Sequence, residues 1–213
     1  MGCQTSVEVL NLQLLPQQQP VAALSAVFCK PEFVTLHLHE KFWSLSGDDF
    51  TVKDAHTGAA WFKINGSVFS LREKKTLLDV HGVAIANMKE EFFSFSPSYN
   101  VYAGGSSSGS PLFVIEAKIS LFESFLRVHF TDVVTGQRCT MGLEGDWLGR
   151  KALIWLDRGR SGVREPVGKV FRPLSAAGNV FLGTQDYYLE IAPNVDAALM
   201  TLICVVLDEK ASD

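Results

Sequence analysis

The 213-residue sequence lacks features that would assign it directly to several common protein classes. It has no excess of positive charge, since 19 Lys and Arg against 23 Asp and Glu give a formal charge of -4. A nucleic-acid-binding domain usually carries a basic face that neutralises phosphates, so nucleic acid is not an expected partner. Cysteine is scarce, and Cys3, Cys29, Cys139 and Cys204 form no C-x-x-C pair and no zinc-site spacing with histidine. We therefore expect reduced thiols.

The chain also lacks a long hydrophobic run and a secretory signal. Its most apolar stretch, residues 197–207, is shorter than the roughly 20 residues that cross a bilayer. The start has no basic region, and residues 7–15 are interrupted by Glu8, Asn11 and Gln13. We therefore expect a cytoplasmic protein in which the rest of the chain covers the apolar stretch.

From residue 22 onward the sequence has the pattern of short antiparallel strands. In three segments an apolar/polar alternation runs into an aspartate, a glycine follows, and the alternation resumes. These segments are FTVKDAHTGAAWFKI (50–64), TLLDVHGVAIANM (76–88) and VHFTDVVTGQRCTM (128–141). Aspartate accepts hydrogen bonds from backbone amides two residues on, and glycine adopts the positive φ that closes such a turn. The sequence therefore predicts a mainly β protein built from hairpins.

The C-terminal segment NVDAALMTLICVVLDEK (194–210) departs from this pattern. Asn194 or Asp196 is a candidate N-cap, and the Ala, Leu and Met residues that follow favour a helix. A helix that is apolar on all sides must be surrounded, and a chain of antiparallel hairpins can surround it as a closed sheet. We predict a central helix inside a β-barrel. The alternative is a final core strand, because TLICVV is β-rich and periodicity alone does not separate the two.

A family resemblance is carried by four segments that are spread along the chain. They are FTVKDAHTGAAWFKINGSVFSLREKKTLLDVHGVAIANMK, LEGDWLGRKALI, PVGKVFR and DYYLEIAPNVDAALMTLICVVLDEK. Residues 33–210 resemble the LURP-one-related family, which belongs with the Tubby C-terminal domains and the phospholipid scramblases. The resemblance implies a closed antiparallel barrel of about twelve strands around a buried hydrophobic C-terminal helix. We expect an N-terminal tail over residues 1–21 and a single barrel domain over residues 22–210.

The same resemblance supplies no catalytic motif. We expect a non-enzymatic, membrane-associated module that binds a phospholipid or phosphoinositide or acts as an adaptor, and we expect no cofactor. The alternative is a soluble protein that binds another, unidentified protein in stress or defence signalling and has no lipid role.

The stretch MGCQTS is the most informative functional motif. Gly2 and Ser6 fit the N-myristoylation pattern, and Cys3 stands where a palmitoyl chain is commonly added. One myristoyl chain binds a membrane only marginally, so stable anchoring needs a second signal. We predict that Gly2 and Cys3 are acylated and that the protein lies at the inner face of the plasma membrane.

Two basic stretches are candidates for contacts with an anionic lipid. The guanidinium fork of arginine suits bidentate phosphate contacts, and glycines let the backbone approach a headgroup. The candidates are Arg158, Arg160, Arg164 and Lys169 in LDRGRSGVREPVGK, and Arg72, Lys74 and Lys75 in SLREKKTLL. The plainer interpretation of these residues is solvated surface charge.

Three further motifs carry no predicted chemistry. Residues 105–109 match G-x-S-x-G but precede a strand pattern, which favours a hairpin loop over a hydrolase nucleophile. His37 and His39 share a strand face without a third metal ligand of clear spacing. The GDD at residues 47–49 lacks the other ligands of a calcium loop. We expect no catalytic residue and no metal site.

Overall fold

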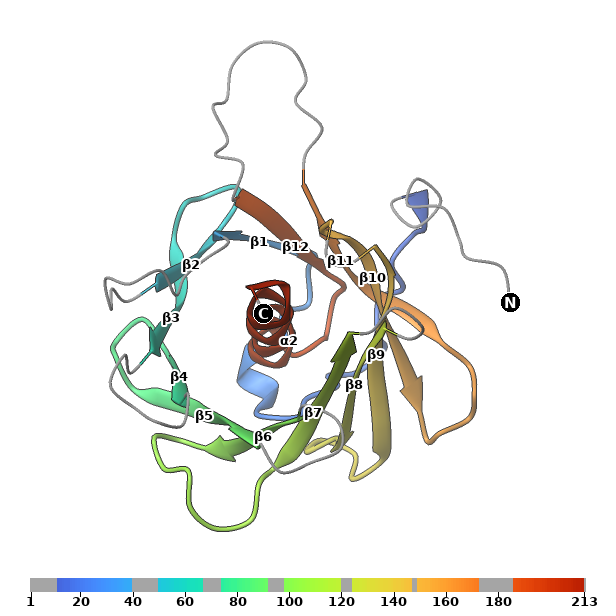
Figure 1. Ribbon diagram of the computed structural model, residues 1–213. Helices are drawn as coiled ribbons and strands as arrows, with labels where there is room; N and C mark the ends of the chain where they lie inside the picture. The colour runs from blue at the N-terminus through green and yellow to red at the C-terminus, as the bar shows by residue number, and fades with distance from the viewer. Residues whose placement is uncertain are drawn as a thin grey trace.

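Twelve antiparallel strands form a closed barrel around one long helix (Figure 1). The computed structural model describes residues 11–39, 50–66, 74–91, 98–119, 124–146, 149–172 and 186–212. The strands are β1 (Val34–His39), β2 (Phe50–Asp54), β3 (Ala60–Gly66), β4 (Lys74–Leu78), β5 (Ala84–Glu91), β6 (Ser98–Ala103), β7 (Phe113–Ile119), β8 (Ser124–Thr131), β9 (Arg138–Asp146), β10 (Lys151–Arg158), β11 (Glu165–Phe171) and β12 (Asp186–Ile191). The helices that lie within the described ranges are the 3-10 turn η1 (Ala26–Phe28) and α2 (Ala197–Ser212). The predicted fold class is confirmed.

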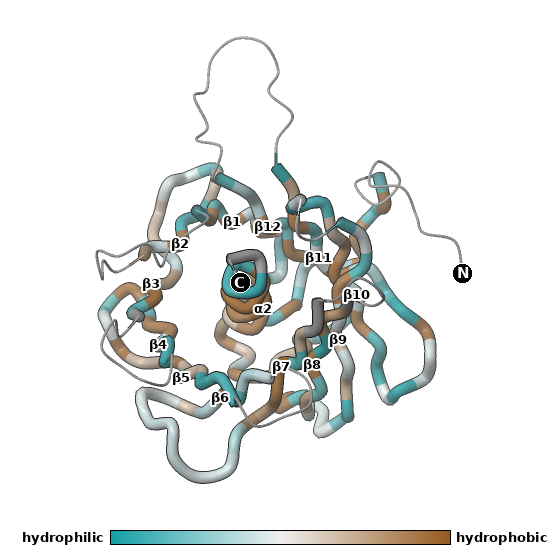
Figure 2. Tube along the Cα trace, in the orientation of Figure 1, coloured by the Kyte–Doolittle hydropathy of each residue, from teal (hydrophilic) through white to brown (hydrophobic). Residues whose placement is uncertain are grey.

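Each strand pairs with its neighbour in sequence, and β12 closes the barrel on β1. Most inward residues are apolar and alternate with more exposed ones, because successive side chains of a strand point to opposite faces. The alternation is complete in β1 and in β12, whose buried residues face the same interior. In Figure 2 the brown body of α2 lies within the ring of strands and ends in teal residues at its C-terminus.

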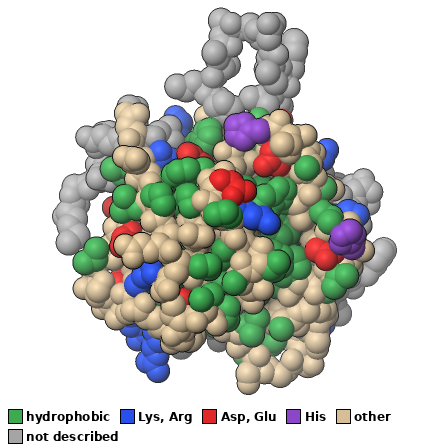
Figure 3. Space-filling view, turned by 180° about the vertical axis from the view of Figure 1, so that it is seen from behind, with side chains coloured by type: hydrophobic (Ala, Val, Ile, Leu, Met, Phe, Trp, Pro, Cys, Tyr) green, Lys and Arg blue, Asp and Glu red, His purple; other side chains and the backbone are tan. Residues whose placement is uncertain are grey.

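The up-and-down topology places alternate connections at opposite ends of the barrel. We call the end where α2 begins the turn end. It carries the turns 55–59, 79–83, 104–112, 132–137 and 159–164 and the link 192–196, which follow the even-numbered strands. Figure 3 looks onto the turn end, and Figure 1 looks onto the opposite end, where α2 finishes.

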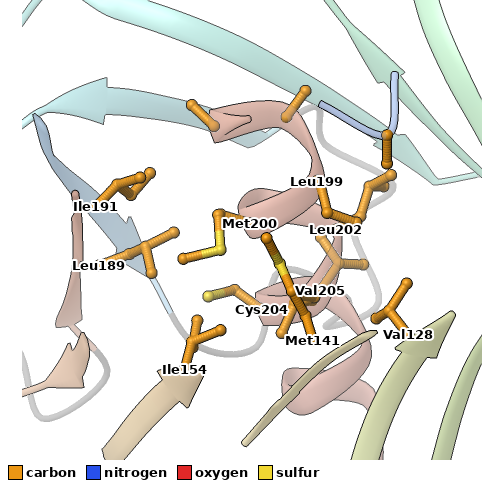
Figure 4. Close-up of a cluster of buried hydrophobic side chains, with 14 of the residues drawn as sticks. Val128, Met141, Ile154, Leu189, Ile191, Leu199, Met200, Leu202, Cys204 and Val205 are labelled. Carbon is orange, nitrogen blue, oxygen red and sulfur yellow. The ribbon is translucent and has the colours of Figure 1, made fainter. Parts of the chain in front are cut away.

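The C-terminal segment forms the predicted helix rather than the alternative core strand. Every residue of α2 from Ala197 to Glu209 is buried. In Figure 4 the side chains of Leu199, Met200, Leu202, Cys204 and Val205 face residues of the surrounding strands. Those strand residues are Val128, Met141, Ile154, Leu189 and Ile191. Helix side chains therefore occupy the space in which an open barrel would hold a small ligand.

The three predicted hairpins are present, and their aspartates act as expected. Asp54 Oδ1 accepts hydrogen bonds from the amides of His56 and Thr57, at 3.0 and 2.7 Å. Asp79 and Asp132 accept from backbone amides of the other two turns in the same way. The glycines of the three turns have positive φ angles, which are 71° at Gly58, 83° at Gly82 and 73° at Gly136. Each turn therefore has its own acceptor for backbone donors that would otherwise need water.

Asp196, rather than Asn194, caps α2. Its Oδ1 accepts from the amides of Ala198 and Leu199 at 3.0 and 3.1 Å. Its Oδ2 accepts from the amides of Ala23 and Leu24 at 3.1 and 2.9 Å. Burial raises the pKa of Asp196 to about 6, although these four hydrogen bonds favour the charged form. One carboxylate thus joins the first turn of the helix to the N-terminal segment.

The described part of the predicted tail packs on the barrel. Leu14 and Val21 are buried in the core, and the amide of Val21 donates to Asn194 O at 2.9 Å. The amide of Ala22 donates to Asp132 Oδ1 at 3.0 Å. In Figure 1 this blue segment crosses the far end of the barrel. Leu12, Leu14 and Val21 of the stretch expected to be a tail therefore pack with the barrel core, whereas Leu15 is exposed.

The opposite end is closed by charged pairs around the last turn of α2. Asp208 accepts from Arg150 Nη2 at 2.5 Å and from the Tyr187 hydroxyl at 2.8 Å. The next two helix residues also pair with the wall, through the ion pairs Glu209 with Lys75 and Lys210 with Glu90. Asp208, Glu209 and Lys210 are therefore each paired with a residue of opposite charge from the surrounding barrel.

Candidate functional site

The predicted basic residues lie in different parts of the molecule. Arg158, Arg160 and Arg164 are at the turn end, where β10 is joined to β11. Lys74 begins β4 at the opposite end. Arg72, like the predicted acylation sites Gly2 and Cys3, lies outside the described residues. The two stretches therefore do not form one patch, and the β10–β11 connection is the stronger candidate.

The segment Asp157 to Glu165, which we call the basic turn, is shaped by its own hydrogen bonds. Asp157 Oδ1 accepts from the Ser161 amide at 2.8 Å and its hydroxyl at 2.9 Å, and Oδ2 accepts from the Gly162 amide at 3.0 Å. The turn contains three positive φ angles, at Gly159 (65°), Arg160 (55°) and Gly162 (81°). This geometry holds Arg160 at the exposed tip.

Arg164 is exposed and lies over an aromatic ring of the outer wall. Its guanidinium carbon is 4.3 Å from the ring centroid of Trp155. Trp155 in turn lies against Gly142 of the paired strand, where any Cβ would overlap the indole. Such a contact restricts the guanidinium plane while leaving its outer face and N–H donors open to solvent.

The other two basic residues of this stretch are engaged with the protein. Arg158 Nη2 donates to the side-chain oxygen of Gln17, in the N-terminal segment. Lys169 is half-buried in β11 and is paired in register with Glu190 of β12. Arg160 and Arg164 are therefore the residues of this set that remain exposed for a ligand.

Lys75 faces the barrel interior and does not belong to a surface site. Its side chain is 7% exposed and forms an ion pair with Glu209 of α2. Lys74, its neighbour, is exposed. The sequence contains the signal for this difference, because Lys75 has the same strand parity as the buried Leu77. Lys75 is accordingly left out of the proposed lipid contacts.

The N-terminal segment is fastened directly beside the basic turn. The amide of Leu15 donates to Pro166 O at 2.8 Å, and the amide of Gln17 donates to Pro193 O at 3.1 Å. The Gln17 carbonyl also accepts from Asn194 Nδ2 at 2.7 Å. The described N-terminal segment is therefore attached at Pro166, near the start of β11, and at Arg158 of the basic turn.

The two strand histidines share one carboxylate. His37 Nε2 and His39 Nδ1 lie 3.0 and 2.9 Å from the same Asp186 oxygen. Burial raises the pKa of Asp186, but the hydrogen bonds from His39 and His37 outweigh it and hold that pKa below its usual value. Across the described ranges no three His, Cys, Asp or Glu side chains are arranged to hold a metal ion. The arrangement is a hydrogen-bonded cluster that joins β1 to β12.

The G-x-S-x-G match and Cys204 lie in places that fit the structural roles expected for them. The G-x-S-x-G match lies in the loop that joins β6 to β7, as expected, and Ser106 Oγ is 2.7 Å from Ser108 Oγ. Cys204 is buried in α2, and burial raises the pKa of its thiol. In the part of the chain that the structure describes, no helix combines the length and the apolarity that crossing a membrane requires.

Comparisons with known proteins agree with this architecture. The family model described as LURP-one-related matches residues 34–208. Protein LURP-one-related 15 of Arabidopsis thaliana is 26% identical over 85% of this chain and 82% of its own length. Protein LURP-one-related 10 of the same plant is 24% identical over 89% of this chain and 96% of its own length.

A solved structure shows the same fold. An X-ray structure of an Arabidopsis thaliana protein matches with a TM-score of 0.61 and 20% identity, and it covers 89% of this chain and 98% of the other. The family model spans the barrel from its first strand to the last turns of α2. The chain therefore belongs to the LURP-one-related family.

Proposed function

We propose that this protein is a non-enzymatic, membrane-associated module that binds anionic phospholipid headgroups at the basic turn. The observation that carries the proposal is the attachment of the N-terminal segment beside that turn, through Leu15 to Pro166 and Gln17 to Arg158. Acyl chains at Gly2 and Cys3 would tether the barrel to the membrane through this segment, which is attached to the basic turn that carries Arg160 and Arg164. The filled interior supports a ligand site on the outer surface.

The chemistry of the basic turn suits phosphate. Arg160 and Arg164 present guanidinium forks that match phosphate oxygens bidentately, and Trp155 restricts one of them before binding. Each well-placed basic residue near an anionic membrane contributes only about 1 kcal/mol. Two such residues do not hold the protein at a membrane by themselves, so the mechanism needs the acyl anchor and uses the turn to select the lipid surface.

The test is flotation with liposomes of plasma-membrane composition, with and without phosphoinositide. Three forms are compared: the acylated protein made in eukaryotic cells, its Gly2→Ala variant and the unmodified barrel. We expect the acylated form to float and phosphoinositide to increase its flotation, whereas the two forms without acyl chains should float weakly or not at all. If the acylated protein fails to float on any of these vesicles, the proposal is wrong and a soluble protein-binding role takes its place.

A further inference from the structure

The exposed large hydrophobic residues of the described chain all lie at the turn end. They are Leu15, Val27, Phe33, Val80, Val83, Leu112, Val133, Val134 and Val163. Most are at the tips of the turns that join even-numbered to odd-numbered strands, and the rest belong to the N-terminal segment that leads into β1. Figure 3 shows hydrophobic side chains spread over this end among charged ones. An apolar surface gathered at one end of a protein marks an interaction site.

The exposure of individual residues at the tips is large. Val83 in the β4–β5 turn is 62% exposed, and Val163 in the basic turn is 63% exposed. Val163 stands beside Arg164, and Arg160 lies three residues before it. The same turn therefore offers an apolar tip, which suits the acyl chains of a phospholipid surface, and two cations, which suit its anionic headgroups.

The backbone at these tips is already hydrogen-bonded within the protein. The amide of Val83 donates to Asp79 Oδ1 at 2.8 Å, and that of Val163 donates to Ser161 Oγ at 3.2 Å. The amides of three further exposed residues are satisfied in the same way, namely Val134 by Asp132 Oδ1, Val133 by Ala22 O and Leu112 by Val101 O. Entry into lipid therefore leaves no backbone N–H unsatisfied at these positions. An unsatisfied N–H is the main cost of placing irregular backbone in lipid.

We propose that the turn end is the face that enters the membrane interface, with the apolar tips of separate turns inserted among the lipid headgroups. This inference rests on the proposed function and adds the lipid-contacting surface. The observations favour a bilayer over a shaped protein partner for two reasons. The apolar residues project from several separate turns with charged residues between them (Figure 3), and the described N-terminal segment is attached beside the same end through Leu15 and Pro166.

The geometry also fixes which end faces away from lipid. Lys74 and Asn65 are exposed at the opposite end, near the C-terminus of α2. With the turn end inserted, the barrel axis and α2 are perpendicular to the plane of the membrane, and Lys74 lies at the end that faces away from it. The two ends therefore provide a test and a control within one chain.

The test uses the full-length acylated protein and phosphatidylcholine vesicles that contain phosphatidylserine and phosphatidylinositol bisphosphate. The test variant Val83→Asp/Val134→Asp/Val163→Asp places three charges on the exposed tips. The control Asn65→Asp/Lys74→Asp changes the net charge by the same amount at the opposite end. We expect the test variant to bind vesicles about tenfold more weakly or worse, and the control to bind like the unchanged protein.

A polarity-sensitive fluorophore provides a second measurement that does not depend on affinity. Attached at Val163→Cys or Val83→Cys, it should shift to the blue when vesicles are added, and at Lys74→Cys it should not. If the acylated protein binds but the probes at positions 83 and 163 remain in water, this inference is wrong while the proposed function stands. A concentration-dependent dimer that the triple variant abolishes, with vesicle binding unchanged, would instead assign the surface to a second copy of the chain.

Discussion

The guanidinium of Arg150 and the carboxylate of Asp208 form an ion pair across 2.5 Å inside the barrel, and each side chain is only 1% exposed. Arg150 precedes β10, whereas Asp208 lies in the last turns of α2. The Tyr187 hydroxyl donates to the second oxygen of the same carboxylate, and the Arg150 guanidinium lies 5.1 Å from the centroid of the Tyr187 ring. The end of the central helix is thus held to the wall by a fully enclosed polar group.

Arg150→Met should lower the free energy of unfolding by about 3–5 kcal/mol, because it leaves the Asp208 carboxylate buried without its cation. The double variant Arg150→Met/Asp208→Leu removes both charges and should recover part of that loss, because it leaves the Tyr187 hydroxyl without its acceptor. Urea denaturation followed by circular dichroism measures both. Equal stability of the single variant and the unchanged protein would show that Asp208 is not held in this way.

Asp196 predicts a pH dependence of stability. Its pKa of about 6 in the folded protein lies above the ordinary value of 3.8, so the folded state binds the proton more tightly than the unfolded state. The contribution of this group is therefore fully present below about pH 4 and is lost as the pH rises to about 6.

Asp196→Asn should remove that part of the pH profile and should also destabilise the protein at every pH. The amide side chain keeps one acceptor, but its NH2 group meets two backbone donors, and a lost helix cap costs about 1–2 kcal/mol. The difference between the two denaturation curves over this pH range isolates Asp196 from carboxylates such as Asp54, whose pKa is lowered by the Thr57 amide. A difference that does not change with pH would contradict the buried, raised pKa.

Gly142 couples the packing of the barrel wall to the position of Arg164. A Cβ at this position overlaps the Trp155 ring, so Gly142→Ala should displace the indole at a cost of about 1–3 kcal/mol. The variant should also weaken vesicle binding, since Arg164 loses its aromatic support. Trp155→Leu makes room for the added methyl group, and Gly142→Ala in that background should cost less than in the unchanged protein.

The aspartates Asp79 and Asp132 should contribute unequally to the free energy of unfolding. Asp79→Ala leaves the His81 and Val83 amides of an exposed turn to water and should cost about 1 kcal/mol. Asp132→Ala should cost more, because Asp132 is 2% exposed and also accepts from the Ala22 amide. Limited proteolysis should cut the N-terminal segment faster in the Asp132 variant alone. Equal cutting of the two variants would show that this hydrogen bond does not hold the segment.

The elements that were predictable from sequence are those whose cause is local. An aspartate followed by a glycine between alternating runs encodes its own turn, and all three such hairpins are present. The choice between helix and strand for residues 197–207 depended on what surrounds them, and the resemblance to a family with a central helix favoured the correct alternative. Asp157 builds a fourth turn of the same chemistry, but Gly162, whose amide it binds, follows five residues later. In the three predicted turns the glycine follows its aspartate after three or four residues, and that pattern does not include Asp157.

The features that sequence reasoning missed depend on distant contacts. Leu14 and Val21 stand among glutamines and prolines without periodicity, and their burial follows from the space at the end of the barrel. Arg158 is held by Gln17, which is far away in sequence. The separation of Lys74 from Arg160 by the length of the barrel follows from strand direction, which becomes readable only once the topology is known.

The most direct test of the central claim compares two variants with the same change in net charge. Arg160→Gln/Arg164→Gln alters the basic turn, and Lys74→Glu alters the opposite end. Flotation of the acylated full-length chain with phosphoinositide-containing vesicles should fall about tenfold or more for the first variant and stay unchanged for the second. Equal flotation of both variants and the unchanged protein would show that the basic turn does not meet the lipid, and would contradict the account.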